Sequence, residues 1–204
     1  VYDINDNLLN KHEEEEFCLK LENCIGKYDI VTVVDYGHGL ITPNIVHILE
    51  DKSNYLAVNT QLNSFNMGYH TISKYKNVNY VCVHEGELRH DYRNRSDSVE
   101  HLVKNLFNQL KSDVILITQG TKGSLAFENS EFTNSPAYAT KVIDRIGAGD
   151  TLLAITSLCF VAGIPTDLTL FIGNLAAAEM VSSIGTGMKL SKINLLKRIE
   201  SLLK

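Results

Sequence analysis

The chain has 204 residues, with 19 Lys plus Arg, 24 Asp plus Glu, a formal net charge of −5 and 44% hydrophobic residues. A chain of this length and apolar content can bury a core, which excludes a disordered segment. The mild acidity and the shortness of its basic runs argue against nucleic acid and anionic membrane surfaces as partners. The longest apolar stretch, 152–165, is too short to span a bilayer and predicts a buried helix.

Four cysteines are scattered along the chain without CxxC spacing, and no charged and apolar leader opens it. This pattern predicts a reduced, cytoplasmic setting. The first residue is Val1, and the residues after it are typical of a strand running into a turn inside a longer protein. We therefore expect a truncated chain or a processed product.

Short β-branched runs alternate with longer segments of helical spacing, which predicts an α/β fold with a mostly parallel sheet. No repeat, linker or change of composition divides the chain, so 1–204 is expected to form a single domain. In chain order, the expected elements are helix 13–24, strand 29–34, helix 44–50, strands 55–58 and 78–83, helix 98–111, strand 113–118, an antiparallel pair 124–128 and 138–143, and helices 150–162, 168–183 and 191–203.

The segment Asp-Arg-Ile-Gly-Ala-Gly-Asp at 144–150 stands immediately before an apolar helix. Small residues at a helix start let consecutive backbone N–H groups point at one spot, and the helix dipole makes that spot suitable for an anion such as phosphate. Asp150 could accept a proton from an alcohol attacking a phosphoryl group held there. Alternatively, Asp150 caps the helix and the glycines serve a tight turn. Residues 147–152 lack the third glycine of a dinucleotide fingerprint, and residues 120–124 lack the spacing of a P-loop.

These residues resemble the C-terminal signature of ribokinase-like sugar kinases, the phosphofructokinase-B family. Segments 33–39, 58–63, 87–89 and 118–124 resemble other family motifs in the same order. The resemblance implies a three-layer α/β/α fold with a mostly parallel central sheet, from which the N-terminal part and the lid are missing. Among subfamilies, the chain most resembles heptose-phosphate kinase-type domains, some of which are fused to a nucleotidyltransferase domain.

The resemblance also implies roles for individual residues. Asp150 would be the catalytic base, and the backbone of Gly147, Ala148 and Gly149 would form the anion hole. The nucleotide site would comprise Thr118, Gly120, Gly123, Asn174 and Gly187, the last two beside the adenine. Two alternatives stay open: 120–123 can be a tight turn between strands, and Asn174 an ordinary polar position on a helix.

Three family positions depart from the usual pattern. The Asn-x-x-Glu motif falls on residues 84–87, so that Glu87 matches and His84 replaces the asparagine. Glu87 would help to hold Mg²⁺, whereas an imidazole is a ligand that Mg²⁺ seldom takes. Asn59 and Gln61 stand where many relatives carry Asp and Lys. Asp35, at the end of its predicted strand, would reach the acceptor substrate, although turn chemistry explains it equally well.

The function implied is ATP- and Mg²⁺-dependent phosphoryl transfer to a hydroxyl of a sugar or sugar phosphate, by a chain that could be inactive alone. The alternative is a catalytically inactive nucleotide-binding or structural domain attached to a nucleotidyltransferase. An exposed apolar surface is expected where a preceding segment would pack, which leaves association into a homo-oligomer open. We expect acceptor specificity to lie mostly in residues outside this chain.

Overall fold

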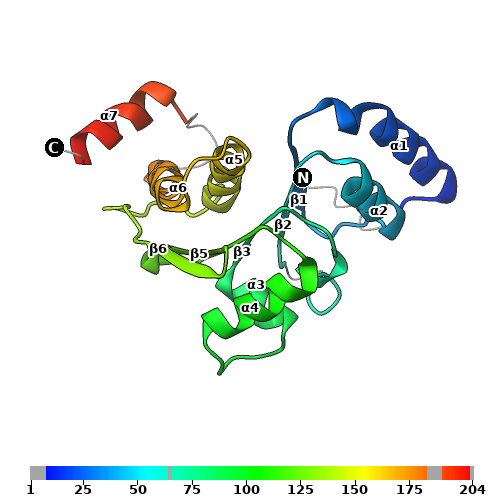
Figure 1. Ribbon diagram of the computed structural model, residues 1–204, viewed down its shortest axis with the longest axis horizontal. Coiled ribbons are helices and arrows are strands. Elements are labelled where there is room, and N and C mark those ends of the chain that lie inside the picture. The colour runs from blue at the N-terminus through cyan, green and yellow to red at the C-terminus, as the bar shows by residue number, and fades with distance from the viewer. Residues whose placement is uncertain (1–7, 64–65, 183–189, 203–204) are drawn as a thin grey trace. The chain divides into compact units, whose positions relative to one another are not determined.

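A computed structural model describes residues 8–63, 66–182 and 190–202 (Figure 1). Its strands follow the order β1-β2-β3-β4-β5-β6 in one sheet. The pairs β1–β2 and β2–β3 are parallel and β5–β6 is antiparallel, which confirms the predicted α/β fold with a mostly parallel sheet. The chain divides into two compact units, residues 1–115 and 116–204, which are described in turn.

The first unit alternates helices and strands as the sequence pattern predicts. Asn10 begins the first helix with a capping box that includes Glu13, and Thr42 followed by Pro43 begins the second. The elements are α1 (Lys11–Cys24), the 3₁₀ turn η1 (Ile25–Lys27), β1 (Val31–Asp35), α2 (Pro43–Lys52), β2 (Leu56–Thr60), the 3₁₀ turn η2 (Ile72–Lys74), β3 (Tyr80–His84), α3 (Glu85–Asp91), α4 (Val99–Leu110) and β4 (Val114–Thr118), which crosses into the second unit.

Parallel pairing brings the carboxyl ends of the first strands to one edge of the sheet. Val33 lies opposite Val58, and Asp35 lies opposite Thr60 at the strand ends. The side chains of β2 are largely buried and those of β3 are buried up to the terminal His84, as expected for strands covered on both faces. The apolar face of α4, which includes Leu102 and Leu106, is also buried.

One short helix escaped prediction. The seven-residue α3 begins directly after β3, with His84 as its N-cap. Its apolar pattern amounts to the single buried residue Leu88, so hydrophobic periodicity could not detect it.

The second unit contains a β-hairpin followed by helices. Its elements are the 3₁₀ turn η3 (Gly120–Lys122), β5 (Ser124–Glu128), β6 (Glu131–Ser135), α5 (Ala148–Val161), α6 (Thr166–Val181) and α7 (Lys192–Leu202). Helices α5 and α6 pack closely (Figure 1). Gly173 permits this approach, because a Cβ there would lie 2.5 Å from Cγ2 of Thr156.

The predicted strand at 138–143 is wrong. Strand β5 pairs instead with Glu131–Ser135, and residues 136–143 form no strand. The reason is the turn: Asn129 and Ser130 adopt φ values of 50° and 67°, so two residues are enough to reverse the chain. The β-branched residues at 138–143 suggested the second strand of the hairpin, but the turn at 129–130 pairs β5 with residues 131–135 instead.

The other helix and strand predictions hold within a few residues at their ends. Helix α5, for example, begins at Ala148 rather than at residue 150. Among the residues that the structure describes, no helix combines the length and apolar character needed to cross a bilayer.

Candidate functional site

The segment before α5 is tied to the end of α6. Backbone N–H groups of Ile143 and Asp144 both donate to the carbonyl of Val181, at 2.7 and 3.3 Å. The Asp144 carboxylate accepts from the N–H of Ile146 at 3.0 Å, which closes a turn. These bonds fix where the following glycines enter the helix.

The start of α5 has the backbone form of an anion site. Gly147 is the N-cap and adopts φ 78°, a left-handed conformation that favours glycine. The N–H of Gly149 makes no hydrogen bond to any described residue, and a Cβ at Gly149 would meet nothing within 4 Å. A ligand can therefore approach this backbone closely. Ala148 is the first residue of the helix, and its N–H donates to the carbonyl of Arg145 at 3.4 Å, so that it would have to leave this weak bond to reach a ligand.

Asp150 is the third residue of α5 and is half-buried. Since Gly147 holds the N-cap position, Asp150 does not cap the helix in the usual sense. A carboxylate in the first turn of a helix interacts favourably with the helix dipole. The structure thus places an unhindered backbone N–H at Gly149 and the carboxylate of Asp150 on one helical turn.

The turn after β4 and the helix α6 meet at the end of the hairpin. A Cβ on Gly123 would lie 2.0 Å from the carbonyl oxygen of Ser135, so only glycine fits there. The side-chain amide of Asn174 donates to Ser124 Oγ at 2.9 Å and to the carbonyls of Ser135 and Pro136 at 3.2 Å each. Asn174 is buried, and these bonds give it a structural role whether or not a nucleotide binds.

The remaining predicted nucleotide residues lie differently. Thr118 ends β4 and is half-buried. Gly120 adopts φ 60°, and a Cβ there would meet no atom within 4 Å. Glycine is therefore favoured at this position by the backbone conformation and not by close packing. Gly187 lies outside the described residues.

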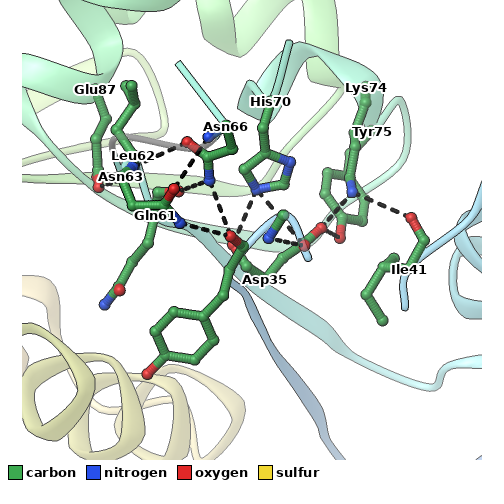
Figure 2. A network of polar contacts seen from close by, with 12 residues as sticks. Asp35, Ile41, Gln61, Leu62, Asn63, Asn66, His70, Lys74, Tyr75 and Glu87 are labelled. Atoms are coloured by element: carbon green, nitrogen blue, oxygen red, sulfur yellow. Dashed lines mark hydrogen bonds and ion pairs between the residues drawn. The ribbon is translucent and has the colours of Figure 1, made fainter. Parts of the chain in front are cut away.

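Asp35 is the centre of a buried network in the first unit (Figure 2). Its carboxylate accepts from the Tyr75 hydroxyl at 2.8 Å and the Gly37 N–H at 3.1 Å, and forms an ion pair with Lys74. His70 Nε2 lies 3.5 Å from the same carboxylate. Burial, followed by the charge of Asp35, raises the pKa of Tyr75, so its hydroxyl stays protonated and donates.

Asn66 closes the wall beside this network (Figure 2). Its amide donates to the carbonyls of Tyr36, at 2.9 Å, and Gln61, at 2.7 Å. Asn63 and Asn66 also exchange bonds between side chain and backbone N–H. The loops that follow β1 and β2 are thereby held together.

His84 and Glu87 form a capping box at the start of α3. The Glu87 carboxylate accepts from the N–H of His84 at 2.7 Å and of Leu62 at 3.2 Å, while His84 Nδ1 accepts from the N–H of Gly86. Burial raises the pKa of Glu87 against the effect of these hydrogen bonds.

The surroundings of Glu87 do not fit direct coordination of Mg²⁺. Both of its oxygens already accept backbone N–H groups, and its raised pKa disfavours the ionised ligand. Within the described ranges, no group of three or more His, Cys, Asp and Glu side chains is placed to hold a metal ion. A role for Glu87 through water stays a prediction.

Sequence reasoning missed four residues of the Asp35 network: Asn66, His70, Lys74 and Tyr75. They come from the chain after β2, where no spacing or composition singles them out. The only indirect signal is Asp35 itself, since a carboxylate at a buried strand end needs partners.

Comparison with known proteins agrees with these features. A family model described as pfkB family carbohydrate kinase matches residues 47–193. The Bifunctional protein HldE of Campylobacter fetus is 27% identical over 179 residues, which cover 84% of this chain and 37% of that protein. The same-named protein of Bradyrhizobium diazoefficiens is 27% identical over 168 residues, covering 80% of this chain and 33% of that protein. The chain therefore spans about a third of the length of these relatives.

Solved structures share the fold at low sequence identity. Phosphofructokinase-2 from Escherichia coli, in complex with potassium, matches with a TM-score of 0.79 and 14% identity, over 97% of this chain and 64% of that one. Ribokinase from Thermotoga maritima matches with a TM-score of 0.68 and 16% identity, over 88% and 59%. These likenesses establish a ribokinase-like fold.

Proposed function

Because this chain belongs to the pfkB family of carbohydrate kinases, we propose that it supplies the catalytic and nucleotide-binding portion of an ATP-dependent kinase acting on a sugar or sugar phosphate. The observation that carries the proposal is the start of α5. There, an open backbone N–H at Gly149 and the carboxylate of Asp150 share one turn. The resemblance of this segment to the family signature supports the same assignment.

In the proposed reaction, the Asp150 carboxylate accepts the proton of the acceptor hydroxyl. The hydroxyl oxygen then forms a bond to the γ-phosphorus of ATP, the bond from that phosphorus to the bridging oxygen breaks, and ADP leaves. The backbone N–H groups of Gly147, Ala148 and Gly149 would stabilise the negative charge on the transferred group. Mg²⁺, when bound with the nucleotide, would neutralise phosphate charge.

The turn 118–123 and Asn174 are proposed to border the nucleotide. Support comes from their meeting at the backbone of Ser135 and Pro136, which makes one rigid wall from three parts of the chain. Gly187 is proposed for the nucleotide site by resemblance alone.

Titration calorimetry with MgATP tests the donor site. Gly149→Val would place branched carbons over the open N–H, so we expect at least tenfold weaker binding, and Gly149→Ala serves as the smaller matched change. Binding by the unaltered chain that both variants retain in full would contradict the proposed anion site.

Asp150→Asn in the natural full-length protein tests the base. Asparagine keeps the size of the side chain but cannot accept the proton, so MgATP binding should persist while phosphoryl transfer falls by a factor of about 10² to 10⁴. Turnover equal to that of the unaltered protein would rule out Asp150 as the base.

A second function is favoured by the contacts of His84. Its side chain is engaged as a helix cap, at the position where the family has an asparagine. A nucleotide-binding or structural domain without catalysis, attached to a nucleotidyltransferase, would tolerate that change. The discriminating result is the absence of Asp150-dependent transfer in the full-length protein, offered a broad panel of sugars and sugar phosphates with MgATP.

A further inference from the structure

The first unit contains a cavity of about 340 Å³ beside the carboxyl end of β1. Its walls come from the loops that follow β1 and β2, with Leu8 and Ile41 as apolar contributors. Asp35, His70 and Lys74 are the ionisable side chains among its lining residues, apart from the phenol of Tyr69. The chemistry of these three side chains determines what the cavity can hold.

The carboxylate of Asp35 is fully engaged by groups of the protein itself. The side chain is 3% exposed, one carboxylate oxygen accepts from Gly37 and faces His70, and the other meets Tyr75 and Lys74. Four groups therefore surround the two oxygens, and a ligand would have to displace one of them. Asp35 acts as a positioning residue that fixes Lys74 and His70.

Lys74 brings a donor into the cavity without bringing net charge. Its ammonium group pairs with Asp35 and donates to the carbonyl of Ile41 at 3.3 Å, which leaves one of its three hydrogens for a ligand. The side chain is 28% exposed. Because the carboxylate of Asp35 balances the ammonium, the pair offers little attraction to a free phosphate.

His70 brings an acceptor. Its side chain is 7% exposed, and Nε2 lies 2.9 Å from the carbonyl oxygen of Asp35 and 3.5 Å from its carboxylate. Both neighbours of Nε2 are acceptors, so in the neutral ring Nε2 carries the hydrogen and Nδ1 offers a lone pair. Nδ1 makes no hydrogen bond to any residue in the described ranges (Figure 2).

The ring of His70 is also held in place sterically. It packs against Gly37, which adopts φ 70° and where a Cβ would lie 2.7 Å from Cγ of the ring and 2.7 Å from Nδ2 of Asn66. Ring orientation is thus determined by packing on one side and by a hydrogen bond on the other. An acceptor held in a fixed orientation on a buried side chain, beside an oriented donor, is a feature of a preformed binding site.

We propose that this cavity binds an uncharged, hydroxyl-bearing part of the acceptor, with a hydroxyl donating to His70 Nδ1 and a hydroxyl oxygen accepting from Lys74 Nζ. A hydroxyl is the group that can both donate and accept, whereas the dianion of a phosphate monoester has no hydrogen for Nδ1. His70 and Lys74 are then specificity-determining residues. The proposal rests on the proposed function only in calling the ligand the acceptor.

Nitrogen NMR of the ¹⁵N-histidine-labelled chain tests the cavity without ATP. The probes are glycerol, erythritol, D-mannose, D-glucose, D-fructose and sedoheptulose, with the dianion of methyl phosphate as the anionic probe. At least one neutral probe should shift the His70 Nδ1 resonance saturably, and methyl phosphate should neither shift it nor compete. Failure of every neutral probe, or competition by methyl phosphate, overturns the proposal.

Paired variants separate binding from folding. His70→Gln retains a donor that can reach the Asp35 carbonyl and deletes the Nδ1 acceptor, so it should fold and bind the neutral probe at least tenfold more weakly. His70→Asn places a polar atom near Nδ1 but cannot reach that carbonyl, so it should keep more binding at lower thermal stability. Equal affinity of His70→Gln and the unaltered chain overturns the proposal.

The outcome is separable from that of the kinase assay. Neutral-probe binding at His70 in a protein whose transfer proves independent of Asp150 would refute the proposed base and leave the cavity assignment standing. Asp150-dependent transfer, together with a His70 resonance that no neutral probe shifts, would support the proposed base and refute the cavity assignment.

Discussion

The two predicted sites of this chain are built from different materials. At the start of α5 the backbone supplies the functional groups, and side chains are removed to expose them, as at Gly147 and Gly149. Around Asp35, side chains supply most of the groups, with Lys74, Tyr75 and His70 converging on one carboxylate and only the N–H of Gly37 coming from the backbone. A site made of backbone groups is kept by the backbone conformation. A site made of buried side chains is kept only while each buried polar group has a hydrogen-bond or ion-pair partner.

The side-chain site should be the more sensitive to a single truncation. Asp35→Ala leaves the Lys74 ammonium and the Tyr75 hydroxyl without their acceptor, and we expect a loss of about 3–5 kcal/mol in the free energy of unfolding. Urea denaturation measures it. Lys20→Gln, which removes an exposed pair with Glu16, is the control and should change stability by less than about 1 kcal/mol. Equal losses would mean that the Asp35 network is not a stabilising unit.

Alanine substitutions should separate two kinds of glycine: those where a Cβ would clash with a neighbour, and those where only the backbone conformation favours glycine. Gly123→Ala meets the Ser135 carbonyl and a φ of 95°, so a loss of about 2–4 kcal/mol is expected. Gly120→Ala meets only the φ of 60°, for which about 1 kcal/mol is expected. Chemical denaturation of both variants gives the ordering, and a larger loss for Gly120→Ala would contradict the packing at Ser135.

The smallest effect concerns the pH dependence of Glu87. Folding raises its pKa above the ordinary value of 4.5, so the folded state binds more protons than the unfolded chain between those two values. Its contribution is therefore most favourable at low pH and is lost as pH rises through the raised pKa. The free energy of unfolding of the unaltered chain, minus that of Glu87→Gln, should fall across this interval. A difference that rises with pH would indicate a lowered pKa.

The contrast also explains what could be read from the sequence. Gly147 to Asp150 form a local pattern, because a backbone site needs its small residues in succession, and the strands of the parallel region were visible as apolar runs. Asn66, His70, Lys74 and Tyr75 could not be linked to Asp35 in advance, since only the folded loops bring them together. Their identities are compatible with any polar loop.

Errors in the fold have similarly local causes. A single buried side chain, Leu88, gave α3 no periodic signal. The second strand of the hairpin was misplaced because a turn made by Asn129 and Ser130, without glycine, carries a weak signature. In both cases, the information lay in backbone geometry that residue types only partly reveal.

The hairpin turn has a consequence for engineering. Ser130 adopts a left-handed backbone conformation. This conformation is unfavourable for a residue that has a Cβ, but not for glycine. Glycine at this position would give the chain a reserve of stability at a point remote in sequence from Asp35 and Gly149. Such a background would keep damaging substitutions at either site folded, so that their effects on ligand binding could be measured separately from unfolding.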